Sequence, residues 1–183
     1  MQETTFGCVE ILKQWTELSS FSILFDSTVD EFTANEFFNK IVNKENIALI
    51  AFTTDGDVFG CFFHVALTEQ HRGFDDPNVF VFSFESHGRC STPQRFLPRD
   101  ENEALAVWCM PDRDFGWFVE IDGAMQACVC FGNEMSILSC FNLSHMFDGM
   151  QDTTLTGNQD PERFSCHRLI AVHFEASIHS VVR

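Results

Sequence analysis

The chain has 183 residues, of which 27 are acidic and 11 basic, so its formal net charge is −16. This charge argues against nucleic-acid binding, which needs lysine and arginine to displace counterions from phosphates, and against binding to an anionic membrane surface. A hydrophobic content of 45% indicates a globular chain that can form one core. We therefore expect a single domain over residues 1–183.

Two helices are predicted near the N-terminus. Apolar residues recur at helical spacing over 6–18, which predicts an amphipathic helix within an N-terminal extension over 1–20. A strand is expected over 22–26. The pattern Thr33-x-x-Glu36 is that of a capping box and predicts the start of a second helix.

From residue 47 onward the hydrophobic period changes to two, which is the period of strands. The segment 47–54 is apolar on both faces, as is typical of a central strand. Asp-Gly pairs at 55–56 and 122–123 predict two hairpin turns. In the strand after residue 79, alternation predicts three inward phenylalanines and two outward polar residues: Phe80, Phe82 and Phe84 inward, Ser83 and Glu85 outward.

Seven or eight short strands that are mostly joined by hairpins do not form βαβ units. They predict a mainly β (α+β) fold, an antiparallel β-sandwich with two or more flanking helices, one of them near the N-terminus. Two polar segments are expected to be loops. The first is 73–78. The second is the Gly-, Thr- and Asp-rich segment 148–163, and we expect this second loop to be mobile.

The sequence contains none of the common catalytic motifs. A Gly-rich phosphate loop, a Walker lysine, a His-Glu-x-x-His helix and a Gly-x-Ser-x-Gly turn are all missing. We therefore nominate no catalytic residue, no metal ligand and no cofactor, and residue chemistry gives an enzymatic function no positive support.

The eight cysteines are scattered and include no C-x-x-C pair, so reduced, mostly packed thiols are the first interpretation. Cys128 and Cys130 are the only close pair. On a strand they would share one face, with Cα atoms about 6.6 Å apart, which is unfavourable for a disulfide. Packing is the preferred interpretation, and redox reactivity of Cys128 and Cys130 is the alternative.

Several segments resemble the TLDc domain family in their order and spacing. They are Ile23–Ser27, Phe32–Phe37, Gly56–Phe62, Asn78–Ser83, Phe115–Glu120 and Cys128–Asn133. The resemblance covers residues 20–176 and implies a stand-alone TLDc domain, a β-sandwich with flanking helices. It also implies a role in resistance to oxidative stress, with no established catalytic mechanism or cofactor.

The resemblance further implies a partner, because members of the family bind the vacuolar proton-pumping ATPase and regulate it. The first functional hypothesis is therefore a non-catalytic interaction module that binds peripheral subunits of this ATPase. The alternative is an antioxidant protein, either a thiol that reacts with peroxide or another enzyme. We expect a cytoplasmic protein, which could be nuclear or reach a membrane through a partner, without membrane insertion.

The chain departs from the family pattern at one loop. Where members commonly have Gly-Thr-Gly-Glu, this sequence has Asp75-Asp-Pro-Asn78, so a function that depends on that Glu is in doubt. Loops on rigid scaffolds often carry function. The predicted binding residues are therefore Arg72, Asp75, Asp76 and Asn78, with the segment 148–162 as the second candidate.

Overall fold

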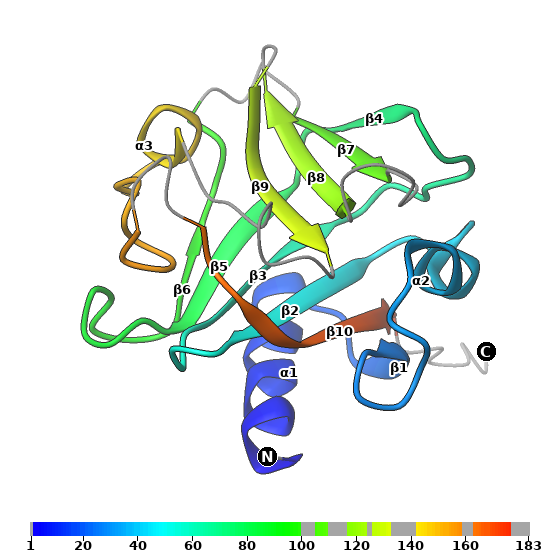
Figure 1. Cartoon of the computed structure of the whole chain (residues 1–183), viewed down its shortest axis with the longest axis horizontal. Helices are drawn as coiled ribbons and strands as arrows, with labels where there is room; N and C mark the ends of the chain where they lie inside the picture. Colours follow the sequence, from blue (N-terminus) through cyan, green and yellow to red (C-terminus); the bar gives the residue numbers. More distant parts are fainter. Residues whose placement is uncertain are drawn as a thin grey trace, which may run out of the picture.

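The structure is a computed structural model that describes residues 2–99, 105–109, 117–123, 126–132, 142–158 and 163–176. Within these residues the chain forms three helices and ten strands (Figure 1): α1 (Gln2–Thr16), β1 (Ser20–Asp26), α2 (Ala34–Ile41), β2 (Ile47–Thr53), β3 (Val58–Phe63), β4 (Gly73–Asp76), β5 (Phe80–Glu85), β6 (Gln94–Phe96), β7 (Leu105–Cys109), β8 (Trp117–Gly123), β9 (Gln126–Gly132), α3 (Leu143–Met146) and β10 (Cys166–Glu175). The helix predicted over 6–18 is present as α1.

The strands form two antiparallel sheets, which confirms the predicted β-sandwich. The six-stranded sheet has the order β1-β10-β2-β3-β5-β6, and the four-stranded sheet has the order β4-β7-β8-β9. The first and last strands of the chain pair with each other, so β1 forms one edge of the larger sheet. Helix α1 covers the outer face of this sheet, while α2 lies beside the sandwich (Figure 1).

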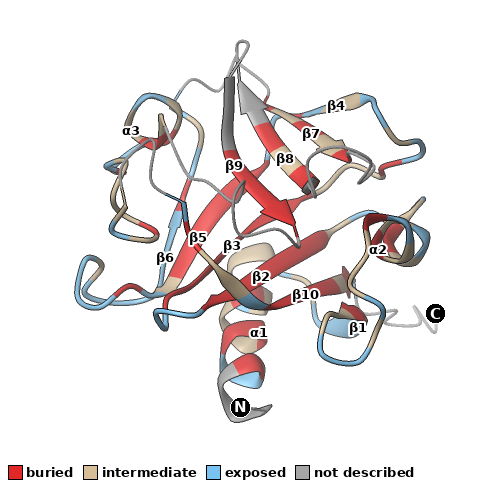
Figure 2. Cartoon of the chain, in the orientation of Figure 1, coloured by how far each residue is buried: buried red, intermediate tan, exposed pale blue. Residues whose placement is uncertain are grey.

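Strand β2 is buried on both of its faces, which explains why the segment 47–54 is apolar throughout. All seven of its residues are buried (Figure 2). Leu49 and Ala51 belong to the core between the sheets. Ala48 and Ile50 belong to a second core that forms under α1. The alternation of strand side chains therefore supplies two hydrophobic cores from one strand.

The start of α2 is capped as predicted. Thr33 is in extended conformation, and its hydroxyl accepts a hydrogen bond of 3.3 Å from the backbone N–H of Glu36. The Glu36 carboxylate pairs with Lys40 one turn further on, at 3.3 Å. The helix then places Phe37 in the core, where its ring lies 5.3 Å from that of Phe25.

The segment predicted as a loop over 73–78 is in part a strand, which corrects the sequence prediction. Gly73–Asp76 forms β4, which pairs with β7 in the register Gly73 to Trp108 and Asp76 to Leu105. At Gly73 a Cβ atom would lie 2.6 Å from the Trp108 ring, so the close approach of the two strands requires glycine. A glycine and two aspartates are poor strand formers, and the pairing with β7 overrides this preference.

The prediction for β5 is also partly wrong. Phe80 and Phe82 pack in the core under α1, whereas Val81 faces the core between the sheets. Glu85 is exposed as expected, but Ser83 is fully buried instead of facing outward. The alternation of side chains separates the two faces of a strand. It does not reveal that both faces of β5 are covered by other parts of the protein.

The hairpin turn predicted at 55–56 is present, whereas the one predicted at 122–123 does not lie at those residues. Gly56 has a φ of +94° in the turn between β2 and β3, a conformation that favours glycine. Asp122 and Gly123 instead end β8, opposite Ala127 and Gln126, and the turn itself lies outside the described residues. In the segment predicted as a mobile loop, the side chains of two described residues, Met150 and Leu155, are buried in the core between the sheets.

Candidate binding site

The predicted binding residues lie in different environments around β4. Arg72, Asp75 and Asn78 are exposed. Arg72 forms an ion pair of 2.6 Å with Glu69, and its guanidinium lies over the ring of Phe74, 5.4 Å from the ring centroid. These residues therefore form a polar surface around the edge strand of the smaller sheet.

Asp76 is different, because its side chain is only 1% exposed. Its Oδ2 accepts hydrogen bonds from the backbone N–H groups of His64 (2.5 Å) and Val65 (3.4 Å), and its Oδ1 accepts one from Asn78 (2.9 Å). Burial raises the pKa of Asp76, but the His64 side chain and the backbone donors outweigh it, so the pKa lies below its ordinary value. Asp76 thus fixes the end of β3 against the link between β4 and β5.

A cavity of about 570 Å³ adjoins this anchor. Its walls come from the last turn of α1, the residue after β3, the link between β4 and β5, the start of β5, and β6 with the residues after it. We call it the α1–β6 pocket, defined by Trp15, Thr16, His64, Pro77, Asn78, Phe80, Arg95, Leu97 and Pro98. Its volume is in the range of known ligand sites, about 300–1,000 Å³.

Both ionisable side chains that line the α1–β6 pocket are basic. Arg95 donates a hydrogen bond of 2.6 Å to the carbonyl of Trp15, and its guanidinium lies 5.8 Å from the centroid of the Phe80 ring. His64 packs edge-to-face on Phe62, with ring centroids 4.9 Å apart. Its Nδ1 is buried 3.7 Å from Oδ2 of Asp76, which is too long for a hydrogen bond, and it has no hydrogen-bond partner among the described residues.

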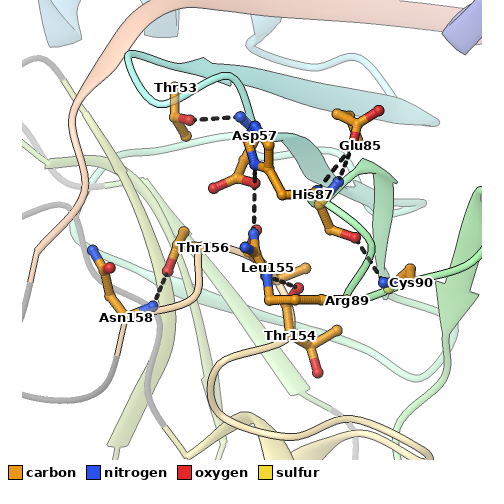
Figure 3. Close-up of polar contacts among 11 residues, drawn as sticks. Thr53, Asp57, Glu85, His87, Arg89, Cys90, Thr154, Leu155, Thr156 and Asn158 are labelled. Carbon is orange, nitrogen blue, oxygen red and sulfur yellow. Dashed lines mark hydrogen bonds and ion pairs between the residues drawn. The ribbon is translucent and has the colours of Figure 1, made fainter.

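A second polar cluster lies at the opposite end of β3 (Figure 3). Asp57 is 2% exposed, and its Oδ1 accepts a hydrogen bond of 2.5 Å from Nη2 of Arg89 and lies 2.9 Å from Nδ1 of His87. Arg89 also donates to the carbonyls of Thr154 (3.2 Å) and Leu155 (2.9 Å). One guanidinium therefore joins the β2–β3 hairpin to the segment after α3.

Sequence reasoning missed this cluster for two reasons. Asp57 directly follows the Asp55-Gly56 turn, where an acidic residue is ordinary, and Arg89 lies 32 residues away in a segment without periodicity. The pattern offered no signal for the pairing. The α1–β6 pocket was missed likewise, because its walls come from segments far apart in the sequence.

The described cysteines are mostly buried. Burial raises the pKa of Cys8 and of Cys109 to about 12 and that of Cys166 to about 11, and it raises the pKa of Cys61 as well. Of the two redox candidates, Cys130 is fully buried, and the side chain of Cys128 lies outside the described residues. Cys90 is half-buried and lines a separate cavity of about 280 Å³ beside Arg89.

The sequence profile of the TLDc domain matches residues 3–170 of the chain. The chain belongs to the TLDc family. The match begins in α1 and ends in β10, so this TLDc domain includes both sheets and the α1–β6 pocket. No curated protein matches the chain. TLDc domains are modules of the protein-interaction type that are linked to resistance to oxidative stress.

Two further observations concern the described part of this TLDc domain. None of its helices is long and apolar enough to cross a membrane. Its His, Cys, Asp and Glu side chains form no group of three or more that could hold a metal ion, within the residues that the structure describes.

Proposed function

We propose that this TLDc domain is a non-catalytic interaction module that binds peripheral subunits of the vacuolar proton-pumping ATPase and regulates the enzyme, with resistance to oxidative stress as the outcome. The observation that carries the proposal is the family match over residues 3–170. The proposal makes the protein cytoplasmic, with access to a membrane only through its partner.

The polar surface around β4 supports a contact with another protein. Arg72, Asp75 and Asn78 are exposed on a paired strand and its flanks, so their positions are fixed before binding. The net charge of −16 favours a partner with a basic surface, and such complementarity mainly increases the association rate.

Binding of the purified chain to the purified peripheral sector of a vacuolar ATPase tests the proposal. Biolayer interferometry should show saturable binding with an association rate that falls as salt is raised. The variants Arg72→Glu and Asp75→Lys should weaken binding. Lys13→Gln is the control, because Lys13 lies in α1, which covers the outer face of the larger sheet, whereas β4 belongs to the smaller sheet.

ATP hydrolysis by the sector is the second readout, and it should change when the wild-type chain is added in excess. Absence of binding by a chain that circular dichroism shows to be folded would reject the ATPase as the partner. Equal loss of binding in the β4 variants and in Lys13→Gln would reject the β4 surface.

One observation favours the antioxidant alternative. Cys90 is half-buried, faces a cavity and follows Arg89, whereas burial raises the pKa of four other described thiols. In this alternative the Cys90 thiolate would attack one oxygen of hydrogen peroxide, and the O–O bond would break to give a sulfenic acid and hydroxide. A peroxide reaction no faster than that of a free thiol would reject it.

A further inference from the structure

We propose that the α1–β6 pocket binds an extended peptide segment of a partner protein that presents a carboxylate beside an apolar side chain. The inference rests on the proposed function in one respect, that the domain works by binding another protein. It does not depend on which protein that is.

The charge of the pocket is the reverse of the charge of the chain. The molecule carries −16 overall, yet Arg95 and His64 line the cavity and none of its lining residues is acidic. Arg95 has no acidic partner among the described residues, so its guanidinium attracts an anion to this cavity. A carboxylate is therefore the group that complements this cavity.

Arg95 differs from the other arginines whose partners are described. Arg72, Arg89 and Arg168 each form an ion pair with a carboxylate. Among the described residues, Arg95 contacts only a neutral carbonyl and the ring of Phe80. These two contacts hold its guanidinium in place and use one of its five N–H donors, which leaves donors for a bidentate carboxylate.

His64 supplies a second polar group whose position is already fixed. Its backbone N–H is bound by the buried Asp76, and its ring packs on Phe62. Because Nδ1 is buried, Nε2 is the ring nitrogen that remains available to a ligand in the pocket. A buried polar atom without a partner needs an explanation.

Besides Thr16 and Asn78, the remaining lining residues of the pocket are apolar. Trp15 stacks on Phe84 with centroids 5.7 Å apart and planes 3° apart, and it meets Phe80 edge-to-face at 6.3 Å. Pro77 and Pro98 also line the pocket, and Leu97 on its wall is 50% exposed. Aromatic and proline surfaces bind aliphatic or proline side chains at little cost in entropy. The occupant should therefore carry an apolar side chain next to its carboxylate.

Selection from a library of random eight-residue peptides tests the inference without a known partner. The purified chain should enrich peptides in which Asp or Glu adjoins Leu, Ile, Phe or Pro. A synthetic peptide of the enriched sequence is then titrated by fluorescence anisotropy, together with its Glu→Gln or Asp→Asn analogue and an analogue with phosphoserine at that position. Loss of the carboxylate should weaken binding by about 10- to 100-fold, the worth of a charge-assisted hydrogen bond.

Variants locate the binding site. Arg95→Gln should weaken binding by at least about tenfold, whereas Lys44→Gln, which changes the net charge equally, should leave binding unchanged. The indole resonance of Trp15 should shift on peptide binding in NMR spectra. Any of three results would overturn the inference: enriched peptides without a carboxylate, equal binding by the neutral analogue, or unchanged binding by folded Arg95→Gln. Tighter binding of the phosphoserine analogue would reassign the site to phosphopeptides.

The peptide site and the proposed binding to the ATPase can fail independently of each other. ATPase binding that persists in Arg95→Gln while peptide binding is lost would support the peptide site and place the ATPase contact elsewhere. Peptide binding by a chain that does not bind the ATPase would leave this inference intact and reject only the proposed partner.

Discussion

The carboxylate of Asp26 in β1 accepts two hydrogen bonds from the guanidinium of Arg168 in β10, 3.0 Å from Nε and 2.5 Å from Nη2. Arg168 is only 9% exposed. It also donates to the hydroxyl of Thr5 in α1 at 3.4 Å and lies 5.5 Å from the centroid of the Phe52 ring. A single side chain therefore joins the edge strand, its neighbour and the helix that covers them.

Removal of this cation should destabilise the fold strongly. We expect Arg168→Met to lower the free energy of unfolding by about 3 kcal/mol, because it leaves the Asp26 carboxylate without its partner. Lys13→Gln removes an exposed ion pair with Glu10 and should cost less than about 1 kcal/mol. Urea denaturation measures both values. Equal effects of the two substitutions would contradict the central role of Arg168.

The same pair should make the domain sensitive to acid. The hydrogen bond from Arg168 is the largest cause that lowers the pKa of Asp26, to about 2. Since the folded pKa is below the unfolded one, the stabilisation is complete above about pH 4 and is lost as the pH falls toward 2. We expect about 1–2 kcal/mol after allowance for partial solvent exposure. Urea titrations at pH 5, 3 and 2 should show a shallower dependence for Asp26→Asn, and an unchanged slope would contradict this assignment.

Two glycines should respond to alanine in opposite directions. At Gly60 in β3 a Cβ would lie 1.8 Å from the carbonyl oxygen of Leu49 and 2.6 Å from the ring of Phe82, so Gly60→Ala must separate β3 from its neighbours. We expect a loss above about 3 kcal/mol or failure to fold. Gly7 lies in α1 with no atom within 4 Å of the added Cβ, and Gly7→Ala should stabilise by about 0.5–1 kcal/mol. The midpoint of thermal unfolding measures both effects. Equal shifts of the midpoint in the two variants would contradict this prediction.

Local sequence patterns suffice to predict those features that depend on neighbouring residues. The Thr33 cap and the Asp55-Gly56 turn were predictable because each depends on residues within one turn of the chain. The strand β4 was not, since Gly-Phe-Asp-Asp becomes a strand only through pairing with β7 and the Trp108 ring over Gly73.

The candidate site was predictable only in part. Arg72, Asp75 and Asn78 are exposed, as a binding surface requires, but Asp76 is a buried anchor because three backbone N–H groups converge on its carboxylate. Nothing local in the sequence brings those donors together. Likewise, Arg95 reaches Trp15 across 80 residues, a contact that only the packing of α1 on the sheet creates.

The contact between Arg89 and the segment after α3 should restrain that segment. Arg89→Gln weakens the link from Asp57 to the carbonyls of Thr154 and Leu155. We expect the amide of Gly157, which is bonded to the carbonyl of Thr153 at 2.9 Å, to exchange at least about tenfold faster. Hydrogen exchange monitored by NMR measures the change.

His87→Gln is the control for this experiment, because the His87 side chain also contacts Asp57 but is about half exposed and forms no hydrogen bond to residues 154–155 within the described part of the chain. Its effect on Gly157 should be small. Rapid exchange of Gly157 in the wild type would support the predicted mobility of 148–163, and an unchanged rate in Arg89→Gln would contradict the restraint.

Cys90 should be the first of the described thiols to react. It is half-buried and lines a cavity, whereas burial raises the pKa of Cys8 and Cys109 from an ordinary value of 9.0 to about 12. Three pKa units reduce the reactive thiolate by roughly a thousandfold, and burial also excludes the reagent.

Maleimide labelling of the native protein, followed by peptide mass spectrometry, should therefore modify Cys90 before Cys8, Cys109 or Cys130. Cys90→Ser should remove the fast phase, while labelling in urea should make all sites equally reactive. A fast phase that maps to Cys130 would contradict the burial argument, and one that maps to Cys128 would restore that residue as the redox candidate.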